Sequence, residues 1–226
     1  MGPRSRKELN QEGTDQYPLA DTRAVSVCFV NDESVDCSER MFAPYVEQHI
    51  SRLGERLFYE LFTSAIVYSG PNRTGPLLML RACTMSGVNG NCGVSTFLFD
   101  YDRNADRFYD VFSNVTGRNN NEETRFTESG PLMGDLIVAY PGYDAPFTYW
   151  VEIYKRDGSG KYERFLQYRG KTVYADGNPL AVIDSEMPEI LRRLKLWAPG
   201  QALPVPARMP AGCTRLFMRK GVEWCE

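Results

Sequence analysis

The stretch FTYWVEIYKRDGSGKYERFLQY, residues 147–168, decides the fold class of this chain. Two runs rich in aromatic and β-branched residues flank Asp157-Gly158-Ser159-Gly160, which has the composition of a tight hairpin turn. Side chains of a strand alternate between its two faces, so the first run places a different set of side chains on each face. One face carries Tyr149, Val151 and Ile153, and the other carries Trp150, Glu152 and Tyr154. The stretch therefore predicts two antiparallel strands with aromatic side chains on both faces.

The same pattern of short strands and turns continues on both sides of this hairpin. Apolar and aromatic runs alternate with turn residues from Leu77 to Asp184, and Leu136–Tyr140 has the composition of a buried strand. Strands at this spacing predict a mainly β (β-rich α+β) fold of antiparallel hairpins, arranged as a barrel, a sandwich or a small propeller-like domain. We expect one further hairpin between Lys171–Tyr174 and Leu180–Ile183.

Two segments have the periodicity of helices. Residues 44–60 begin at Pro44, a favoured first helical residue, and continue with apolar side chains at helical spacing. Residues 188–197 show the same spacing, and Asp184 or Ser185 is placed to cap them. Residues 1–20 are polar and without periodicity. We expect them to form a disordered arm, followed by a single disulfide-stapled β-rich domain over 21–226.

The six cysteines form three local pairs, each of which straddles a turn. The pairs are Cys28 and Cys37, Cys83 and Cys92, and Cys213 and Cys225. A hairpin at each turn would bring the two sulfurs together, although six cysteines allow many other pairings. Disulfides persist in oxidising compartments, so we expect a periplasmic or extracellular protein whose export signal is absent from this sequence. Six buried thiols are the alternative interpretation.

The overall charge is balanced, with 26 basic and 29 acidic residues and a formal net charge of -3. Nucleic acids and anionic membranes attract basic patches, so this balance argues against both as the main partner. The chain also contains no run that approaches the roughly 18 apolar residues of a membrane-spanning helix. We therefore expect a protein partner, or else a saccharide, but no nucleic acid and no membrane span.

The sequence offers few groups for catalysis. His49 is the single histidine and lies within a helical pattern, and the motifs of common nucleophilic, phosphate-binding and zinc-dependent enzymes are absent. Bridged cysteines would leave no thiol nucleophile, so pairs of carboxylates are the remaining route to hydrolysis. The candidates are Glu122-Glu123, Asp135, Asp176, Asp184 and Glu186. Solvated loops and helix caps account for the same residues, and we lean towards a protein that is not an enzyme.

Residues 100–106 suggest one cofactor, a calcium ion. Asp100, Asp102, Asn104 and Asp106 place oxygen ligands at positions 1, 3, 5 and 7 of a calcium-binding loop. Ala105 replaces the usual glycine of such a loop, and Val111 replaces the bidentate glutamate. A β-turn capped by Asp and Asn side chains explains the same residues, and we favour that explanation.

Aromatic residues between 140 and 154 suggest a binding surface. Tyr143, Tyr149, Trp150 and Tyr154 are the candidates, because amphipathic aromatic side chains beside loops anchor proteins or sugars. The alternative is a second buried face of the sheet. We hypothesise an exported binding protein that presents loops and aromatic side chains to a protein partner, as an inhibitor or an immunity protein does. The alternative hypothesis is a secreted hydrolase that acts on polysaccharide or peptidoglycan through a carboxylate pair.

Overall fold

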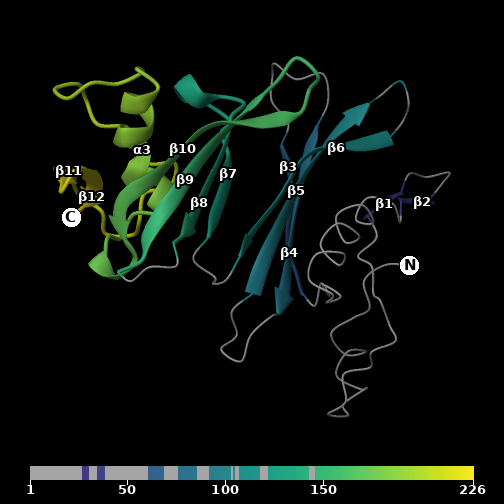
Figure 1. The fold of residues 1–226 in the computed structure, drawn as a ribbon, viewed down its shortest axis with the longest axis horizontal. Helices are drawn as coiled ribbons and strands as arrows, with labels where there is room; N and C mark the ends of the chain where they lie inside the picture. The colour runs from purple at the N-terminus through teal and green to yellow at the C-terminus, as the bar shows by residue number, and fades with distance from the viewer. Residues whose placement is uncertain are drawn as a thin grey trace, which may run out of the picture.

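The computed structural model describes residues 27–30, 35–38, 61–68, 76–85, 92–102, 104, 107–117, 122–142 and 146–226. Two four-stranded antiparallel sheets and the helix α3 make up most of this part of the chain (Figure 1). The mainly β fold is therefore confirmed. Its form is that of two open sheets, because neither sheet closes into a barrel in the described residues.

Each of the two sheets is a meander in which strands that are neighbours in the chain pair with one another. The first sheet contains β3 (Leu61–Tyr68), β4 (Leu77–Met85), β5 (Cys92–Asp102) and β6 (Arg107–Gly117). The second contains β7 (Glu123–Phe126), β8 (Leu136–Pro141), β9 (Thr148–Arg156) and β10 (Tyr162–Val173). β9 and β10 are the hairpin predicted from residues 147–168. Its turn is held by the Asp157 carboxylate, which accepts hydrogen bonds from the backbone N–H groups of Ser159 and Lys161 at 2.9 Å each.

A continuous apolar core joins the two sheets face to face. It combines Leu77, Met79, Leu98, Val111 and Phe112 of the first sheet with Phe126, Leu136, Val138 and Tyr162 of the second. The Phe112 ring meets the Tyr154 ring edge-on, with centroids 4.8 Å apart. Two ion pairs cross the same interface, Arg156 with Asp100 and Arg81 with Glu122. The sheets therefore form a sandwich, the second of the three arrangements expected from the sequence.

The opposite face of the second sheet is covered by α3 (Val182–Arg193). Tyr149, Val151 and Ile153 of β9 lie in this second core together with Ile183 and Ile190 of the helix. The predicted division of β9 into two different faces is thus confirmed. Both faces are buried because the second sheet is the middle of three layers.

The helix α3 begins earlier than the sequence predicts, and it includes residues expected to form a strand. Leu180–Ile183 leads into the helix, so the expected hairpin with Lys171–Tyr174 is wrong. The first residue of the helix is Val182 rather than Pro188, and the predicted cap by Asp184 or Ser185 does not form. A residue from another element supplies the cap instead, since the N–H of Ile183 donates to Glu123 Oε2 on β7 at 3.0 Å.

Two 3-10 helices, η2 (Gly130–Leu132) and η3 (Tyr174–Asp176), and two short hairpins complete the described part of the chain. β1 (Val27–Val30) pairs with β2 (Val35–Ser38), and β11 (Leu216–Arg219) pairs with β12 (Val222–Cys225). The expected arm over 1–20 and the expected helix over 44–60 lie outside the described residues. None of the helices that the structure describes is long and apolar enough to cross a membrane.

The three predicted cysteine pairs differ in how the structure places their members. Cys213 and Cys225 form a disulfide with their Cα atoms 5.6 Å apart, so this pair is confirmed. Cys28 lies directly opposite Cys37 in the β1–β2 hairpin. On β4 and β5, Cys83 lies opposite Val94 and Cys92 lies opposite Met85, which puts the two cysteines in diagonal rather than facing positions.

Candidate functional site

A groove of about 410 Å³ lies where α3, the segment after it and the β11–β12 turn meet, and its volume is in the usual range for ligand-binding cavities. Its apolar lining consists of Pro188, Trp197, Pro199, Leu203 and Met218. Its polar lining consists of Lys171, Glu189, Arg192 and Gln201, with Gly200 and Gly221 completing the wall. The groove therefore joins an apolar surface to two cationic side chains.

The end of α3 forms the first wall of the groove. The N–H of Leu196 donates to the carbonyl of Leu191 at 2.8 Å, and the N–H of Lys195 donates to that of Arg192 at 3.0 Å. These two bonds define a Schellman motif, in which the residue after the C-cap adopts a left-handed conformation and is usually glycine. Here that residue is Lys195, with φ of 60°.

The segment after the helix forms the second wall and is held by its own hydrogen bonds. Trp197 Nε1 donates to the carbonyl of Ala202 at 2.9 Å, and the N–H of Ala198 donates to Gln201 Oε1 at 2.7 Å. The N–H of Gln201 returns a bond to the carbonyl of Ala198 at 3.2 Å. These bonds fix the indole ring of Trp197 in the wall of the groove.

The β11–β12 turn forms the third wall. Arg219 pairs with Val222, so the two-residue loop consists of Lys220 and Gly221, with φ of 52° and 84°. Two successive positive φ angles define a type I′ turn, which normally contains Asn or Gly at its first position. The side chain of Lys171 packs against this turn. A Cβ atom added to Gly221 would lie only 2.8 Å from the Nζ atom of Lys171.

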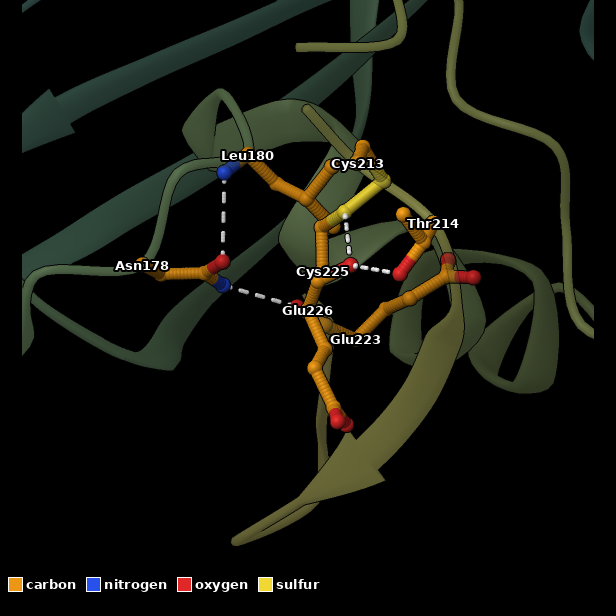
Figure 2. The surroundings of a disulfide bond; sticks show 7 residues. All are labelled: Asn178, Leu180, Cys213, Thr214, Glu223, Cys225 and Glu226. Carbon is orange, nitrogen blue, oxygen red and sulfur yellow. Dashed lines mark hydrogen bonds between the residues drawn. A yellow bond between two sulfur atoms is a disulfide. The ribbon is translucent and has the colours of Figure 1, made fainter. Parts of the chain in front are cut away.

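The hairpin that carries this turn is joined to the body of the protein at the carbonyl of Glu223, and Figure 2 shows the residues around its disulfide. The Asn178 side chain donates to the carbonyl of Glu223 at 2.8 Å, and Ser185 Oγ donates to the same carbonyl at 2.9 Å. Thr214 Oγ1 donates to the carbonyl of Glu226 at 2.9 Å. All four residues of β12 are buried. The third wall is therefore a fixed part of the fold.

Glu223 of β12 carries a buried carboxyl group, and the residues that the structure describes offer it no hydrogen-bond partner. Its side chain is 0% exposed, and neither carboxyl oxygen has a partner among the described residues. Burial, together with the nearby charge of Asp184, raises the pKa of Glu223 to about 7. Asp184 is itself held by Arg125, whose Nη1 and Nη2 donate to it at 2.5 and 2.9 Å.

The aromatic side chains predicted to form a binding surface are placed differently. Tyr149 is 3% exposed in the core beneath α3. Tyr154 packs on Phe112, and its hydroxyl donates to the buried Glu152 at 2.5 Å. Trp150 is half-buried on β9, and Tyr143 lies outside the described residues. The structure therefore uses Tyr149 and Tyr154 to fill the two cores.

The predicted calcium ligands are partly engaged by protein groups. Asp100 is buried, forms the ion pair with Arg156 and accepts a hydrogen bond from the N–H of Tyr101 at 2.9 Å. Asp102 Oδ1 accepts from the N–H of Asn104 at 2.9 Å, as in an Asx turn. Asp106 lies outside the described residues, and no cluster of three metal-binding side chains occurs within them.

None of the candidate catalytic carboxylates is among the residues that line the groove. Glu122 accepts from Thr116 Oγ1 at 2.8 Å, and Asp135 pairs with Lys155 at 3.2 Å. Glu186 is completely buried and accepts hydrogen bonds from the backbone of β10. The one carboxylate in the lining is Glu189, which pairs with Arg192 and Arg193 at 2.7 Å each.

Sequence reasoning did not find the groove. Its residues come from positions 171 to 221, and the segment 199–210 reads only as an extended, proline-rich connector. The buried carboxyls of Glu152 and Glu223 were also missed, because each occurs in a strand where alternation suggests either of two faces. Comparisons of the chain with protein families, with curated proteins and with solved structures found no match.

Proposed function

We propose that this chain is a binding protein and that the groove between α3, residues 197–203 and the β11–β12 turn receives a side chain or short segment of a protein partner. The observation that carries the proposal is the groove itself. Trp197 and Met218 give it apolar walls, and hydrogen bonds and a disulfide-linked hairpin hold those walls in place. A preformed apolar groove favours binding, because little conformational entropy is lost when it is filled.

The chemistry of the lining supports binding more than catalysis. Among the described residues that line the groove, Glu189 is the one with a carboxylate, and two arginines neutralise it. Hydrolysis of a glycoside needs two carboxyl groups that face the same bond. The lining therefore favours the binding hypothesis over the hydrolase.

The Cys213–Cys225 disulfide supports an oxidising compartment, and we propose the periplasm or the cell exterior. A protein that acts by occupying another protein, such as an inhibitor or an immunity protein, needs a rigid surface and no catalytic group. The rigid groove meets that requirement.

The test is a selection of peptides from a random displayed library against the intact chain, followed by affinity measurements on three proteins. Met218→Asp places a charge on the apolar wall, and Phe165→Ala is the control because Phe165 is an exposed aromatic residue on β10 outside the groove. We expect selected peptides to bind the wild type and Phe165→Ala equally.

Met218→Asp should bind the same peptides more than about tenfold more weakly, since an apolar anchor contributes about 1.5–3 kcal/mol. Thermal melts establish that the variants are folded. Failure to select any peptide, or equal binding by Met218→Asp, would overturn the proposal.

A further inference from the structure

The segment 191–222, which supplies most of the groove's lining, is strongly basic, although the chain as a whole is not. Residues 191–222 contain seven basic and no acidic side chains. The seven are Arg192, Arg193, Lys195, Arg208, Arg215, Arg219 and Lys220, and all of them are exposed. The acidic side chains that flank this stretch at 184, 186, 189 and 223 are buried. Positive charge therefore faces solvent while negative charge points inward.

Most of this positive charge is not neutralised by the acidic residues that the structure describes. Glu189 forms ion pairs with Arg192 and Arg193, and Glu226 forms an ion pair with Arg215. The remaining four cations form no ion pair with any acidic residue that the structure describes, and they are Lys195, Arg208, Arg219 and Lys220. Lys171 of β10 likewise has no ion pair among the described residues. Lys171 lines the groove. In the sequence, Lys195 lies between the lining residues Arg192 and Trp197, and Lys220 lies between the lining residues Met218 and Gly221.

Two of these lysines occupy backbone positions that disfavour them. Lys195 and Lys220 are the two non-glycine residues with positive φ among the described residues, at 60° and 52°. A residue with a Cβ is strained in this region by about 1 kcal/mol relative to glycine. The chain thus carries a lysine at each of two positions beside the groove where glycine would be more stable, and strain of this kind is concentrated at functional sites.

We propose that the groove binds an acidic segment of a partner protein, with one apolar side chain of that segment between Trp197 and Met218 and its carboxylates near Lys171, Lys195 and Lys220. This inference rests on the proposed function and names the chemistry of the partner. A protein segment fits better than an anionic lipid surface, because the apolar residues line a concave groove rather than a protruding edge. The unpaired lysines supply the charge complementarity.

The test compares three synthetic peptides that share one leucine anchor and differ in the flanking residues, which are glutamate, glutamine or lysine. Fluorescence anisotropy gives their dissociation constants at about 50 and 300 mM salt, between which the screening length falls by about 2.5-fold. We expect the glutamate peptide to bind at least tenfold more tightly than the glutamine peptide at low salt. High salt should remove most of that difference.

The variants Lys195→Gly and Lys220→Gly test the lysines without loss of the fold, because glycine relieves the strain at both positions. Each should weaken binding of the glutamate peptide by threefold or more and leave binding of the glutamine peptide unchanged. Lys161→Gln is the control, since Lys161 is an exposed lysine at the β9–β10 turn outside the groove.

The outcomes separate this inference from the proposed function. If the glutamate and glutamine peptides bind with equal affinity, and Met218→Asp binds neither, the proposal of an acidic partner is overturned. The proposal that the groove binds a protein partner then still stands. No binding of any peptide overturns both. Binding to vesicles of anionic lipid, but not to vesicles of neutral lipid or to the peptides, also overturns the inference and assigns the basic surface to a membrane.

Discussion

Glu186 of α3 stands so close to Gly170 of β10 that a Cβ on Gly170 would lie 2.8 Å from Glu186 Oε1. The same oxygen accepts hydrogen bonds from the N–H groups of Lys171 and Thr172 at 2.7 Å each and from Thr172 Oγ1 at 2.8 Å. The register of β10 against β9 shifts between Arg169 and Val173. A helix carboxylate thus satisfies backbone groups that the irregular end of the strand leaves unpaired.

Replacement of this carboxylate should destabilise the protein. Glu186→Ala leaves buried N–H donors without an acceptor, each at a cost of about 1–3 kcal/mol, so we expect a loss on the order of 3 kcal/mol in the free energy of unfolding. Urea denaturation measures it. Glu163→Ala is the control, because Glu163 is an exposed glutamate on the same strand and should change stability little. Gly170→Ala should also destabilise, since the added methyl group overlaps Glu186.

Glu223 should make stability depend on pH. Its pKa is raised from 4.5 to about 7 in the folded protein, so the folded state retains a proton that the unfolded state releases between these values. The bound proton therefore contributes its full stabilisation below pH 4.5. The free energy of unfolding then falls as the pH rises to about 7, by on the order of 3 kcal/mol.

Glu223→Gln should remove this dependence, because the amide carries no charge at any pH. We expect the variant to be more stable than the wild type at pH 8 and similar to it near pH 4.5. Glu226→Gln, an exposed glutamate in the same hairpin, controls for the change of net charge. If the difference between Glu223→Gln and the wild type does not change with pH, the carboxyl is not buried without a partner in solution.

The strained lysines predict that two substitutions increase stability. Lys195→Gly and Lys220→Gly should each raise the free energy of unfolding by up to about 1 kcal/mol, since glycine adopts positive φ without steric cost. Thermal melts of both variants and of Lys195→Ala, which keeps a Cβ, provide the comparison. A gain for alanine equal to that for glycine would show that charge, not backbone strain, is responsible.

The Cys213–Cys225 disulfide should stabilise the hairpin that walls the groove. The bridge closes a loop with a sequence separation of 12, for which the loss of chain entropy in the unfolded state corresponds to about 3 kcal/mol. The double variant Cys213→Ser/Cys225→Ser isolates this bridge from the other cysteines. We expect a lower melting temperature and weaker peptide binding. An unchanged melting temperature would mean that the hydrogen bonds of Thr214, Asn178 and Ser185 hold the hairpin without it.

Calcium should leave the melting temperature unchanged relative to a chelator. Asp100 already pairs with Arg156, and Asp102 caps its own turn through Asn104. An increase with calcium that disappears in Asp102→Asn would contradict this prediction and restore residues 100–106 as a metal loop.

Local features of the sequence predicted the strands and turns well. The Asp157–Gly160 turn, the two faces of β9 and the buried strand at Leu136–Tyr140 all depend on residues close together in the chain. The start of α3 could not be predicted in the same way, because its cap is Glu123, a residue about sixty positions earlier.

The net charge of -3 says nothing about which charges are exposed. The acidic side chains of α3 and β12 are buried. Glu186 accepts hydrogen bonds from the backbone of β10, Asp184 and Glu189 pair with arginines, and Glu223 has no partner in the part of the chain that the structure describes. The lysines and arginines of residues 191–222 are exposed. Only the packing of three layers makes that division.

The sequence by itself determined the antiparallel hairpins, because alternation and turn chemistry act over a few residues. It also identified the cysteine pair of the last hairpin, whose members are separated by one turn. Only the tertiary structure decided where the groove lies and what charge surrounds it. Both arise from contacts between α3, a proline-rich segment and a distant hairpin, and no local pattern encodes such contacts.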